Sequence, residues 1–495
     1  MGVHYDDQTV VVTYEDEGIG SEVEYTFEQL FMPARIPFST VCISTQNDGP
    51  PISVPIVIHY GQEVPLFGQE HTIHIRDSTR FWRLYENQAP LPWICASRLG
   101  ETPVVVPPDD GADLYVCRSG QLTSTNADIV ASSFALLSRY EEIRPAHLDA
   151  FDRFPAEASA AKREGFLQRP VVNEYIDLLY SMLAPFVEIR PVDWEGAPFC
   201  LCLTHDIDEV KLFRNCRRVL SSIYRSFARR WNPTDPIGVA ADCCGVLAGV
   251  RKDPHDDVEM LIGIEREYGI SATYFFMAGE TSKRYDGRYK ISEQGQLLRA
   301  ILDAGGEVGL HGSFDSYLRH EVLLGERRRL EDVLGAPVRG NRQHYLRWET
   351  PATWAAIEAA GFEYDSTLGY ASTPGFRSGI CYPYRPFDVT RRRQLDLWEI
   401  PLIAMDASLL GCQGCSPDEA ANWMYCLVDA VRRHRGIAVL LWHSGVFYER
   451  ENPGVLRAYR GLLERITALS PYSATLEDAL MHWIGRLQPP IAGGA

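Results

Sequence analysis

Two different rhythms of apolar and polar positions divide the chain. Over residues 1–195, short apolar runs bounded by turn residues favour strands, and two longer stretches repeat their apolar residues at helical spacing. A proline-containing stretch at 189–198 is typical of a linker. The pattern predicts an N-terminal accessory domain of mixed α+β structure over 1–195. Its expected strands are 9–15, 51–60, 71–76, 102–108 and 113–119. Its expected helices are 126–142 and 171–186.

From residue 196 to residue 490 the rhythm changes, and apolar runs of strand length alternate with longer amphipathic stretches. Strands separated by helices of this length are typical of βαβ units in a parallel sheet. Six or seven such units fit a closed or nearly closed barrel, so we predict an α/β fold with a (β/α) barrel of about seven strands. The expected strands are 199–204, 271–277, 306–312, 362–367, 397–403 and 436–443, and the expected helices are 258–269, 295–305, 327–335, 350–361 and 418–434.

Composition and charge narrow the class of function. The chain has 495 residues and a net charge of -18, which argues against nucleic acid as the partner because phosphate binding needs a basic surface. No apolar run approaches the roughly 20 residues that a membrane-spanning helix needs. The first residues lack the basic and apolar regions of a secretory signal, and 12 cysteines are too sparse for a disulfide scaffold. We therefore expect a cytoplasmic protein with reduced thiols.

Polar residues with catalytic chemistry follow the expected strands of the barrel. Buried charge is costly unless it is paired or holds a metal, so such residues at strand ends indicate a site. A single histidine after a strand is more often structural, but several polar groups converging on one barrel rim favour a functional site. The residues are Asp206, Asp208, His311, Asp315, Arg342, His344, Asp365 and His443.

Three of these residues have the donor atoms that a divalent ion needs. Asp208 and His311 suit zinc, cobalt or a similar ion, and Asp315 shares a face with His311 if the stretch between them opens a helical turn. Asp206 and Asp208 are two residues apart, so both point to the same face of an extended chain. One carboxylate can then bind the metal while the other takes a proton from water.

Five motifs follow one another in a characteristic order. They are THDID, ATYFFM, ILDAGGEVGLHGS, RRLEDVLGAPVRGNRQHY and LLWHSGVF. Together they resemble the polysaccharide deacetylases of carbohydrate esterase family 4, over about residues 198–485. The resemblance implies metal-dependent hydrolysis of an N-acetyl amide in a glycan or glycan precursor, with release of acetate.

The resemblance also implies roles for single residues. By position in the motifs, Asp206 is the general base, and Asp208 and His311 are metal ligands. Arg342 orients the base, and His443 is the general acid that protonates the leaving amine. The metal and a backbone N–H would hold the oxyanion, which is typically the largest electrostatic contribution in acyl transfer.

One motif departs from the family pattern. Where the family has a second histidine four residues after His311, this chain has Asp315, and Gly312 replaces the usual Ser or Thr. Asp315 can ligate the same ions, His320 or a water can take the place, or Asp315 is only a helix-start carboxylate. His205 and His344 have no assigned role; either could contact substrate, and a packed, hydrogen-bonded histidine is the favoured interpretation for His205.

Two other functions stay open. The same chemistry could hydrolyse a small non-glycan amide, or the barrel could be catalytically inactive and bind glycan. The joint presence of Asp206, Arg342 and His443 favours an enzyme, since a binding protein needs no base and acid. Aromatic residues beside the motifs are candidate sugar-stacking surfaces or core packing, namely Tyr345, Trp348, Tyr370 and Trp442.

Two stretches outside the motifs carry further hypotheses. Through the stretches SFALLSRYEE, DRFPAEASAAKREGF and PVVNEY, the N-terminal part resembles the region that accompanies a bacterial subgroup of deacetylase-like proteins. In it the stretch 139–142 could close over the barrel mouth or form a solvated helix end, and we favour the latter. The basic amphipathic stretch 211–231 could pack on the barrel, or contact an anionic glycan or the membrane surface.

Overall fold

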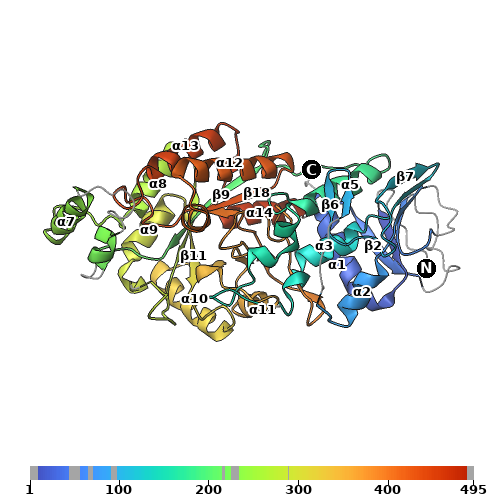
Figure 1. Ribbon diagram of the computed structural model, residues 1–495, viewed down its shortest axis with the longest axis horizontal. Coiled ribbons are helices and arrows are strands. Elements are labelled where there is room, and N and C mark those ends of the chain that lie inside the picture. The colour runs from blue at the N-terminus through green and yellow to red at the C-terminus, as the bar shows by residue number, and fades with distance from the viewer. Residues whose placement is uncertain are drawn as a thin grey trace, which may run out of the picture.

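The computed structural model describes residues 9–43, 56–64, 71–90, 97–145, 147–213, 218–224, 234–287 and 289–487. Two sheets follow one another along the long axis of the molecule, the smaller from the N-terminal part and the larger from the rest (Figure 1). The last strand of the first sheet ends at Thr125, and the first strand of the second begins at Cys200. This arrangement agrees with the change of rhythm in the sequence, while the boundary near residue 195 stays a prediction.

The first sheet has the order β2-β1-β3-β4-β8-β7, and all of its neighbours are parallel except the β7–β8 pair. Its strands are β1 (Val10–Tyr14), β2 (Phe38–Cys42), β3 (Ile56–Tyr60), β4 (His71–Ile75), β7 (Val116–Ser119) and β8 (Leu122–Thr125). A separate hairpin joins β5 (Ser97–Leu99) and β6 (Thr102–Val104). The helices are α1 (Gly20–Phe31), α2 (Thr79–Glu86), α3 (Ile129–Leu137), α4 (Ala160–Arg163) and α5 (Val171–Leu183).

The second sheet is parallel throughout, with the order β16-β13-β12-β11-β10-β9-β18-β17 and β19 beside β9. Within the described residues no pairing joins β16 to β17, so the sheet is curled and open. The predicted α/β fold with a parallel, barrel-like sheet is therefore confirmed. Its strands are β9 (Cys200–Ile207), β10 (Ala272–Phe276), β11 (Glu307–Gly312), β12 (Gly340–Gln343), β13 (Tyr364–Asp365), β16 (Trp398–Glu399), β17 (Ala404–Met405), β18 (Ile437–Leu441) and β19 (Tyr472–Ser473).

The sheet has more strands than the predicted seven, because the sequence pattern does not reveal the shortest ones. β17 and β19 have two residues each, which is too short for an alternating pattern to be visible. β12 has the sequence Gly-Asn-Arg-Gln, and all four residues are buried although none is apolar. A polar strand of this kind cannot be predicted from hydrophobicity, and it carries part of the site described below.

Helices connect the strands largely where the sequence predicts them. Around the second sheet they are α7 (Thr234–Leu247), α8 (Val258–Glu267), α9 (Gly295–Asp303), α10 (His320–Leu334), α11 (Ala352–Ala359), α12 (Pro417–Arg433), α13 (Val455–Thr467) and α14 (Leu476–Leu487). The start of α12 shows the local cause, because the Ser416 hydroxyl accepts from the Glu419 N–H at 3.3 Å and the Glu419 carboxylate accepts from the Ser416 N–H at 2.8 Å. None of the helices in the described residues is long and apolar enough to cross a membrane.

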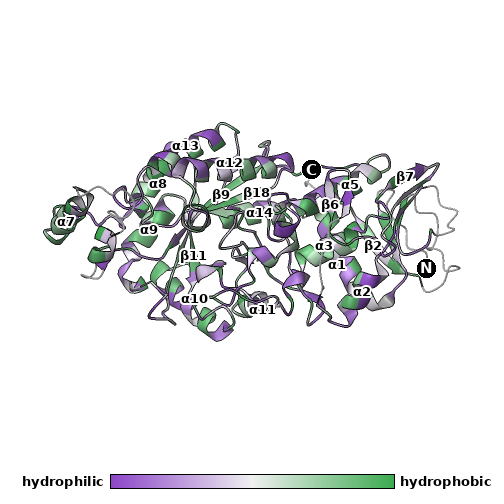
Figure 2. Ribbon diagram, in the orientation of Figure 1, coloured by the Kyte–Doolittle hydropathy of each residue, from purple (hydrophilic) through white to green (hydrophobic). Residues whose placement is uncertain are grey.

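Strand β9 lies at the centre of the larger sheet, between β10 and β18. All eight of its residues are buried, which is typical of a parallel strand covered on both faces. In Figure 2 the ribbons in this central region are mainly hydrophobic. The buried run explains why Asp206, near its end, is itself buried.

The N-terminal part and the barrel share one continuous hydrophobic core, and a buried ion-pair network lies between them. The carboxylate of Glu142 accepts hydrogen bonds from Arg377 at 2.8 Å and from Arg139 at 2.9 Å. Burial raises the pKa of Glu142, but the two guanidinium groups outweigh it and lower that pKa to about 2. The solvated helix end expected at 139–142 is therefore wrong, because Arg139 is fully buried and Glu142 is 5% exposed.

We expect Glu142→Gln to destabilise the whole protein. The substitution leaves the buried cations of Arg139 and Arg377 without their shared carboxylate, and breaking a buried ion pair in this way typically costs about 3–5 kcal/mol. The matched control is Glu188→Gln, since Glu188 pairs with Arg190 on the surface and such a pair contributes about 0–1 kcal/mol. Chemical denaturation of both variants measures the difference. Equal midpoints would contradict the prediction.

The stretch 211–231 is only partly within the described residues. Leu212 is buried against Val239 and Tyr448, whereas Leu220 and Tyr224 in the helical piece 218–224 are 65% and 71% exposed. The rest of the stretch, at 214–217 and 225–231, lies outside the described residues. Contact of this stretch with a membrane surface stays a prediction.

Candidate active site

Neighbouring parallel strands bring most of the candidate residues to one edge of the larger sheet. β9, β10, β11 and β12 are consecutive in the sheet, and β18 lies on the other side of β9. Because all run in the same direction, their carboxyl ends meet at one edge. Asp206 lies on β9, His311 on β11 and Arg342 on β12, while Asp208 follows β9 and His443 follows β18.

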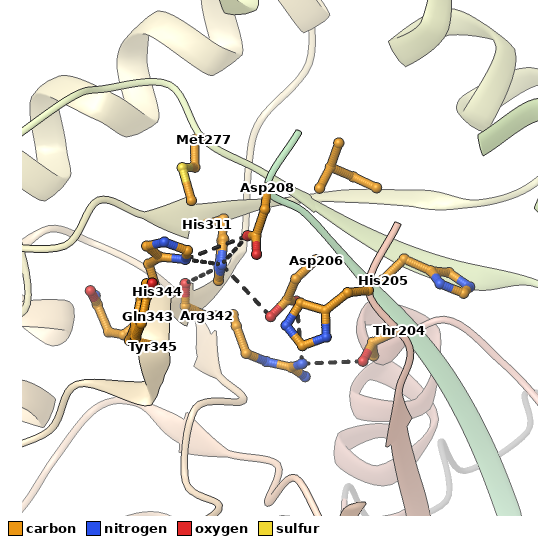
Figure 3. A network of polar contacts seen from close by, with 12 residues as sticks. Thr204, His205, Asp206, Asp208, Met277, His311, Arg342, Gln343, His344 and Tyr345 are labelled. Atoms are coloured by element: carbon orange, nitrogen blue, oxygen red, sulfur yellow. Dashed lines mark hydrogen bonds and ion pairs between the residues drawn. The ribbon is translucent and has the colours of Figure 1, made fainter. Parts of the chain in front are cut away.

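Three ligand atoms form a compact triangle at this edge. Figure 3 shows Asp208, His311 and His344 pointing toward one another. The His344 Nδ1 atom lies 3.0 Å from His311 Nε2, and Asp208 Oδ1 lies 3.3 Å from His311 Nε2 and 3.4 Å from His344 Nδ1. Among the described residues, this is the group of three or more His, Cys, Asp or Glu side chains that could hold a metal ion.

Hydrogen bonds to backbone carbonyls set the protonation of both histidines. His311 Nδ1 lies 2.9 Å from the Arg342 carbonyl, and His344 Nε2 lies 2.9 Å from the Tyr285 carbonyl. A carbonyl oxygen can only accept, so each of these ring nitrogens carries the hydrogen. In the neutral rings, the other nitrogen of each histidine therefore presents a lone pair to the triangle.

This arrangement fits a divalent cation. Two imidazole lone pairs and one carboxylate oxygen face one another, and three acceptors at such distances repel unless a cation lies between them. Asp208 Oδ1 is buried and has no hydrogen-bond partner among the described residues, which is the state expected of an atom that takes a metal ion. Two histidines and one carboxylate, with a position left for water, are ligands typical of catalytic zinc.

Beside the triangle, Arg342 holds the carboxylate of Asp206. Arg342 Nη1 lies 3.4 Å from Asp206 Oδ1 and donates to Thr204 Oγ1 at 3.2 Å, and Nη2 donates to Ser366 Oγ at 3.0 Å. The guanidinium lies over the Phe275 ring at 4.7 Å from its centroid. Both Arg342 and Asp206 are buried, and the other oxygen of Asp206 lies 3.7 Å from His311 Nε2. The carboxylate thus stays oriented toward the triangle.

His443 forms the other side of the site, paired with Asp406. Its Nδ1 atom lies 2.6 Å from Asp406 Oδ1, and its backbone N–H donates to Asp406 Oδ2 at 3.2 Å. Burial lowers the pKa of His443, but Asp406 outweighs it and raises that pKa to about 10. The imidazole is therefore held as the cation, with its Nε2 hydrogen free of the Asp406 contact.

A cleft of about 670 Å³ contains these groups. Asp206, Asp208, His311, His344 and His443 all contribute to its lining. The cleft also receives Phe151 and Arg153 from the N-terminal part of the chain. Buried acids, bases and a candidate cation site thus converge on one concave surface, which is typical of an active site.

Other candidate residues lie away from the triangle. Asp315 is paired with Arg347, whose Nη1 donates to the carboxylate at 2.7 Å, and its side chain is 47% exposed. The structure places His344, not Asp315, as the third member of the cluster. His320 is 49% exposed beside Glu321. The expectation that Asp315 or His320 completes the ligand set thus finds no geometric support, because Arg347 binds Asp315 and His320 begins α10 outside the cluster.

The remaining polar and aromatic candidates are mainly structural. His205 is fully buried and bonds the Glu265 carboxylate at 2.7 Å and the Trp442 carbonyl at 2.8 Å, which agrees with a packed histidine. Asp365 accepts from Asn341 at 2.7 Å. Of the four aromatic candidates, Tyr345 lines the cleft, and Trp348, Tyr370 and Trp442 are wrong as sugar-stacking surfaces because each is at most 5% exposed.

Three residues of the cleft escaped the sequence analysis as functional groups. Asp406 follows the short strand β17 and an apolar run, so the strand-end signal that marks Asp206 was present there as well. His344 was noted without a role, because nothing in the sequence shows that it turns back toward His311. Phe151 belongs to a loop of the N-terminal part and carries no signal of its own.

Comparison with known proteins gives two kinds of match. Residues 11–187 match a family of unknown function, DUF7033. Among curated proteins, none matches the sequence. The solved structures to which the chain is similar include ones described as a polysaccharide deacetylase, as a CE4 domain of a xylanase and as peptidoglycan deacetylases.

Three of these structures show how low the sequence identity and the TM-score are. A Mycobacterium smegmatis protein assigned as a polysaccharide deacetylase shares 20% identity, with a TM-score of 0.40 over 62% of this chain and 99% of that one. A family 4 carbohydrate esterase from Streptomyces lividans shares 15% (TM-score 0.27; 44% and 84% covered). A family 4 pseudoenzyme from Bacillus anthracis shares 12% (TM-score 0.26; 62% and 81% covered). Similarity this distant assigns no activity, which must come from the site.

Proposed function

We propose that this protein is a metal-dependent hydrolase that cleaves an N-acetyl amide in a glycan or glycan precursor and releases acetate. The observation that carries the proposal is the triangle of Asp208, His311 and His344, in which carbonyl hydrogen bonds turn two imidazole lone pairs toward one carboxylate oxygen. Beside it lie a carboxylate suited to be a base and a histidine suited to be an acid. A binding protein would need neither.

Asp208, His311 and His344 are the residues that would hold the ion, with zinc as the first candidate and cobalt or a similar ion as the next. A divalent ion held there supplies Lewis-acid polarisation of the substrate carbonyl. His311 and His344 are fixed for this purpose by their bonds to backbone carbonyls, and such partners typically raise affinity by orienting the ring.

Asp206 is the proposed general base. Its carboxylate takes a proton from the water whose oxygen attacks the amide carbon, and Arg342 keeps that carboxylate pointed at the cluster. His443 is the proposed general acid. It gives its Nε2 proton to the amide nitrogen as the C–N bond breaks, so that acetate and a free amine leave, and Asp406 keeps the imidazole protonated until that step.

The substrate class rests on the cleft and on the motif resemblance. Carbohydrate is the proposed partner because the cleft exposes aromatic rings next to the cluster, and such rings stack against the apolar faces of sugars. A small non-glycan amide and an inactive glycan-binding barrel are the alternatives. An amidase for small amides would release no acetate from sugars. An inactive glycan-binding barrel would bind sugars without metal-dependent turnover.

Metal removal and reloading test the proposal. Protein treated with a chelator, dialysed and reloaded with one equivalent of zinc is assayed for acetate release from N-acetylglucosamine and its β-1,4-linked tetramer. We expect the reloaded protein to act at least about tenfold faster than the chelated one, because the ion stabilises the developing negative charge. Sugar binding without acetate release in either form would favour the inactive barrel. Release of an amine from small amides alone would favour the second alternative.

A further inference from the structure

The loop at residues 149–153 belongs to the region that matches a family of unknown function, yet it forms part of the active-site cleft. The loop is closed on itself. The Asp149 carboxylate accepts from the backbone N–H groups of Phe151 at 2.8 Å and Arg153 at 3.0 Å, and the Asp149 N–H donates to the Arg153 carbonyl at 2.9 Å. Such a loop presents its side chains in fixed positions.

Contacts of the buried Arg347 hold this loop on the barrel. Arg347, which is 5% exposed, donates to the Phe151 carbonyl at 3.1 Å and to the Asp152 carboxylate at 2.9 Å. Its Nη1 donates to the Phe314 carbonyl at 2.9 Å, and its guanidinium lies 4.2 Å from the centroid of the Phe314 ring. The loop is therefore held by a residue that follows the candidate ligand His344 by three positions.

A second contact joins the loop to the residue that follows a member of the candidate metal cluster. Arg153 Nη1 donates to the carbonyl of Tyr345, the residue after His344. Tyr345 has φ of 61°, a left-handed conformation that non-glycine residues seldom adopt, and such strain persists where the surroundings hold it. The N-terminal part thus helps to hold the turn that places His344 in the triangle.

Three aromatic rings in contact, those of Tyr345, Tyr285 and Phe151, extend from the cluster to the loop and are called the aromatic wall here. The His344 and Tyr345 ring centroids are 4.6 Å apart, and those of Tyr345 and Phe151 are 4.9 Å apart. Tyr285 packs against both, at 5.5 Å from Tyr345 and 5.7 Å from Phe151. All three aromatic side chains line the cleft, and Tyr345 is 37% exposed. Phe151 lies one ring further along the wall than Tyr345.

We propose that residues 149–153 form a second sugar-binding subsite of the cleft, in which the Phe151 ring stacks on the sugar next to the one that is deacetylated. The inference rests on the proposed function and extends it, because it assigns a role to the N-terminal part and makes the substrate an oligosaccharide. The Phe151 ring is separated from His344 by the Tyr345 ring, so the proposal predicts that a longer sugar depends on Phe151 more than a monosaccharide does. Arg284 lies beside this wall, with its guanidinium 5.0 Å from the centroid of the Tyr285 ring.

Kinetics with two sugars test the subsite. Acetate release is measured on N-acetylglucosamine and on its β-1,4-linked tetramer, for the zinc-loaded protein of 495 residues and for its Phe151→Ala variant. We expect the substitution to raise KM for the tetramer about five- to tenfold, the usual worth of one aromatic stacking contact, and to leave kcat and the monosaccharide kinetics unchanged. Phe151→Tyr should restore the wild-type KM, because the ring returns.

The matched control is Phe186→Ala. Phe186 is a half-buried phenylalanine of the same N-terminal part that stacks on His71 and does not line the cleft. It should behave as the wild type on both sugars. An unchanged tetramer KM in Phe151→Ala, or an equal loss on both sugars, would overturn the subsite.

A separate measurement keeps the subsite distinguishable from the proposed function. If the wild type releases acetate from neither sugar, calorimetric titration with the tetramer decides. Tetramer binding that is weakened about five- to tenfold by Phe151→Ala supports the subsite while the deacetylase proposal fails for this sugar. No tetramer binding by the wild type overturns the subsite as well.

Discussion

Replacing His344 by alanine is expected to abolish the binding of a divalent ion, whereas replacing Asp315 is expected to leave that binding unchanged. His344 presents the Nδ1 lone pair to His311 and Asp208, so its removal leaves two protein ligands. Loss of a group that merely orients a ligand typically weakens metal binding about 10- to 100-fold, and loss of a ligand should exceed that. Acetate release should fall with the metal.

Elemental analysis and a competition titration with a zinc indicator at fixed pH measure this effect. The pH is fixed because ligand protonation competes with the metal. The wild type should hold about one ion per chain, the stoichiometry of a single catalytic site. The controls are Asp315→Asn and His320→Ala, which remove the two side chains that the sequence offered as third ligands. If His344→Ala still held about one ion per chain and Asp315→Asn lost it, Asp315 rather than His344 would be the third ligand.

Two members of the candidate metal cluster could be predicted from the sequence, and the third could not. Asp208 and His311 could be predicted because each follows an apolar run that has to become a buried strand, which places its end at the sheet edge. Asp315 was expected from its place in the family motif and from a helical turn that would return it to the face of His311, four residues earlier. The turn after β11 is not helical, so that spacing does not return the side chain to the same face, and Arg347 binds it instead.

His344 depends on two facts that no local pattern contains. β12 pairs with β11 so that Arg342 lies opposite His311, although β12 is a polar strand that hydrophobicity does not reveal. The chain then turns at Tyr345 through a left-handed conformation. Both facts depend on distant partners. Asn341 is paired with Asp365 across the strands, and Arg153 bonds the Tyr345 carbonyl from 192 positions away.

The same limit applies to the interface between the two parts of the chain. The stretch 139–142 is charged, and a charged run at a helix end usually faces solvent. Here Glu142 has two arginine partners, and one of them, Arg377, is separated from it by 235 positions. Pairing over such a distance cannot be inferred from the charges themselves. The overall α/β rhythm was visible because it is local, whereas the buried polar contacts that join the parts are not.

Replacing Asp206 by asparagine is expected to stop turnover while leaving the metal bound. Asparagine has nearly the same shape but cannot accept a proton at neutral pH, so the attacking water loses its base. General base catalysis contributes typically 10²- to 10⁴-fold, and we expect kcat for acetate release to fall by about 10³-fold with little change in KM. Asp206 is not one of the three atoms of the triangle, so metal content should stay near one ion per chain.

Three readouts on the same preparation separate this outcome from damage to the fold. Metal content and calorimetric binding of the N-acetylglucosamine tetramer should match the wild type in Asp206→Asn, since the amide still accepts from Arg342. Thermal melting should stay cooperative but move to lower temperature, because the buried guanidinium of Arg342 loses its carboxylate partner. Asp315→Asn is the matched control, because it makes the same chemical change in a carboxylate outside the cluster and should keep its activity. Loss of metal in Asp206→Asn would place Asp206 among the ligands. Retained turnover would show that another group removes the proton from water, and the base would have to be sought elsewhere in the cleft.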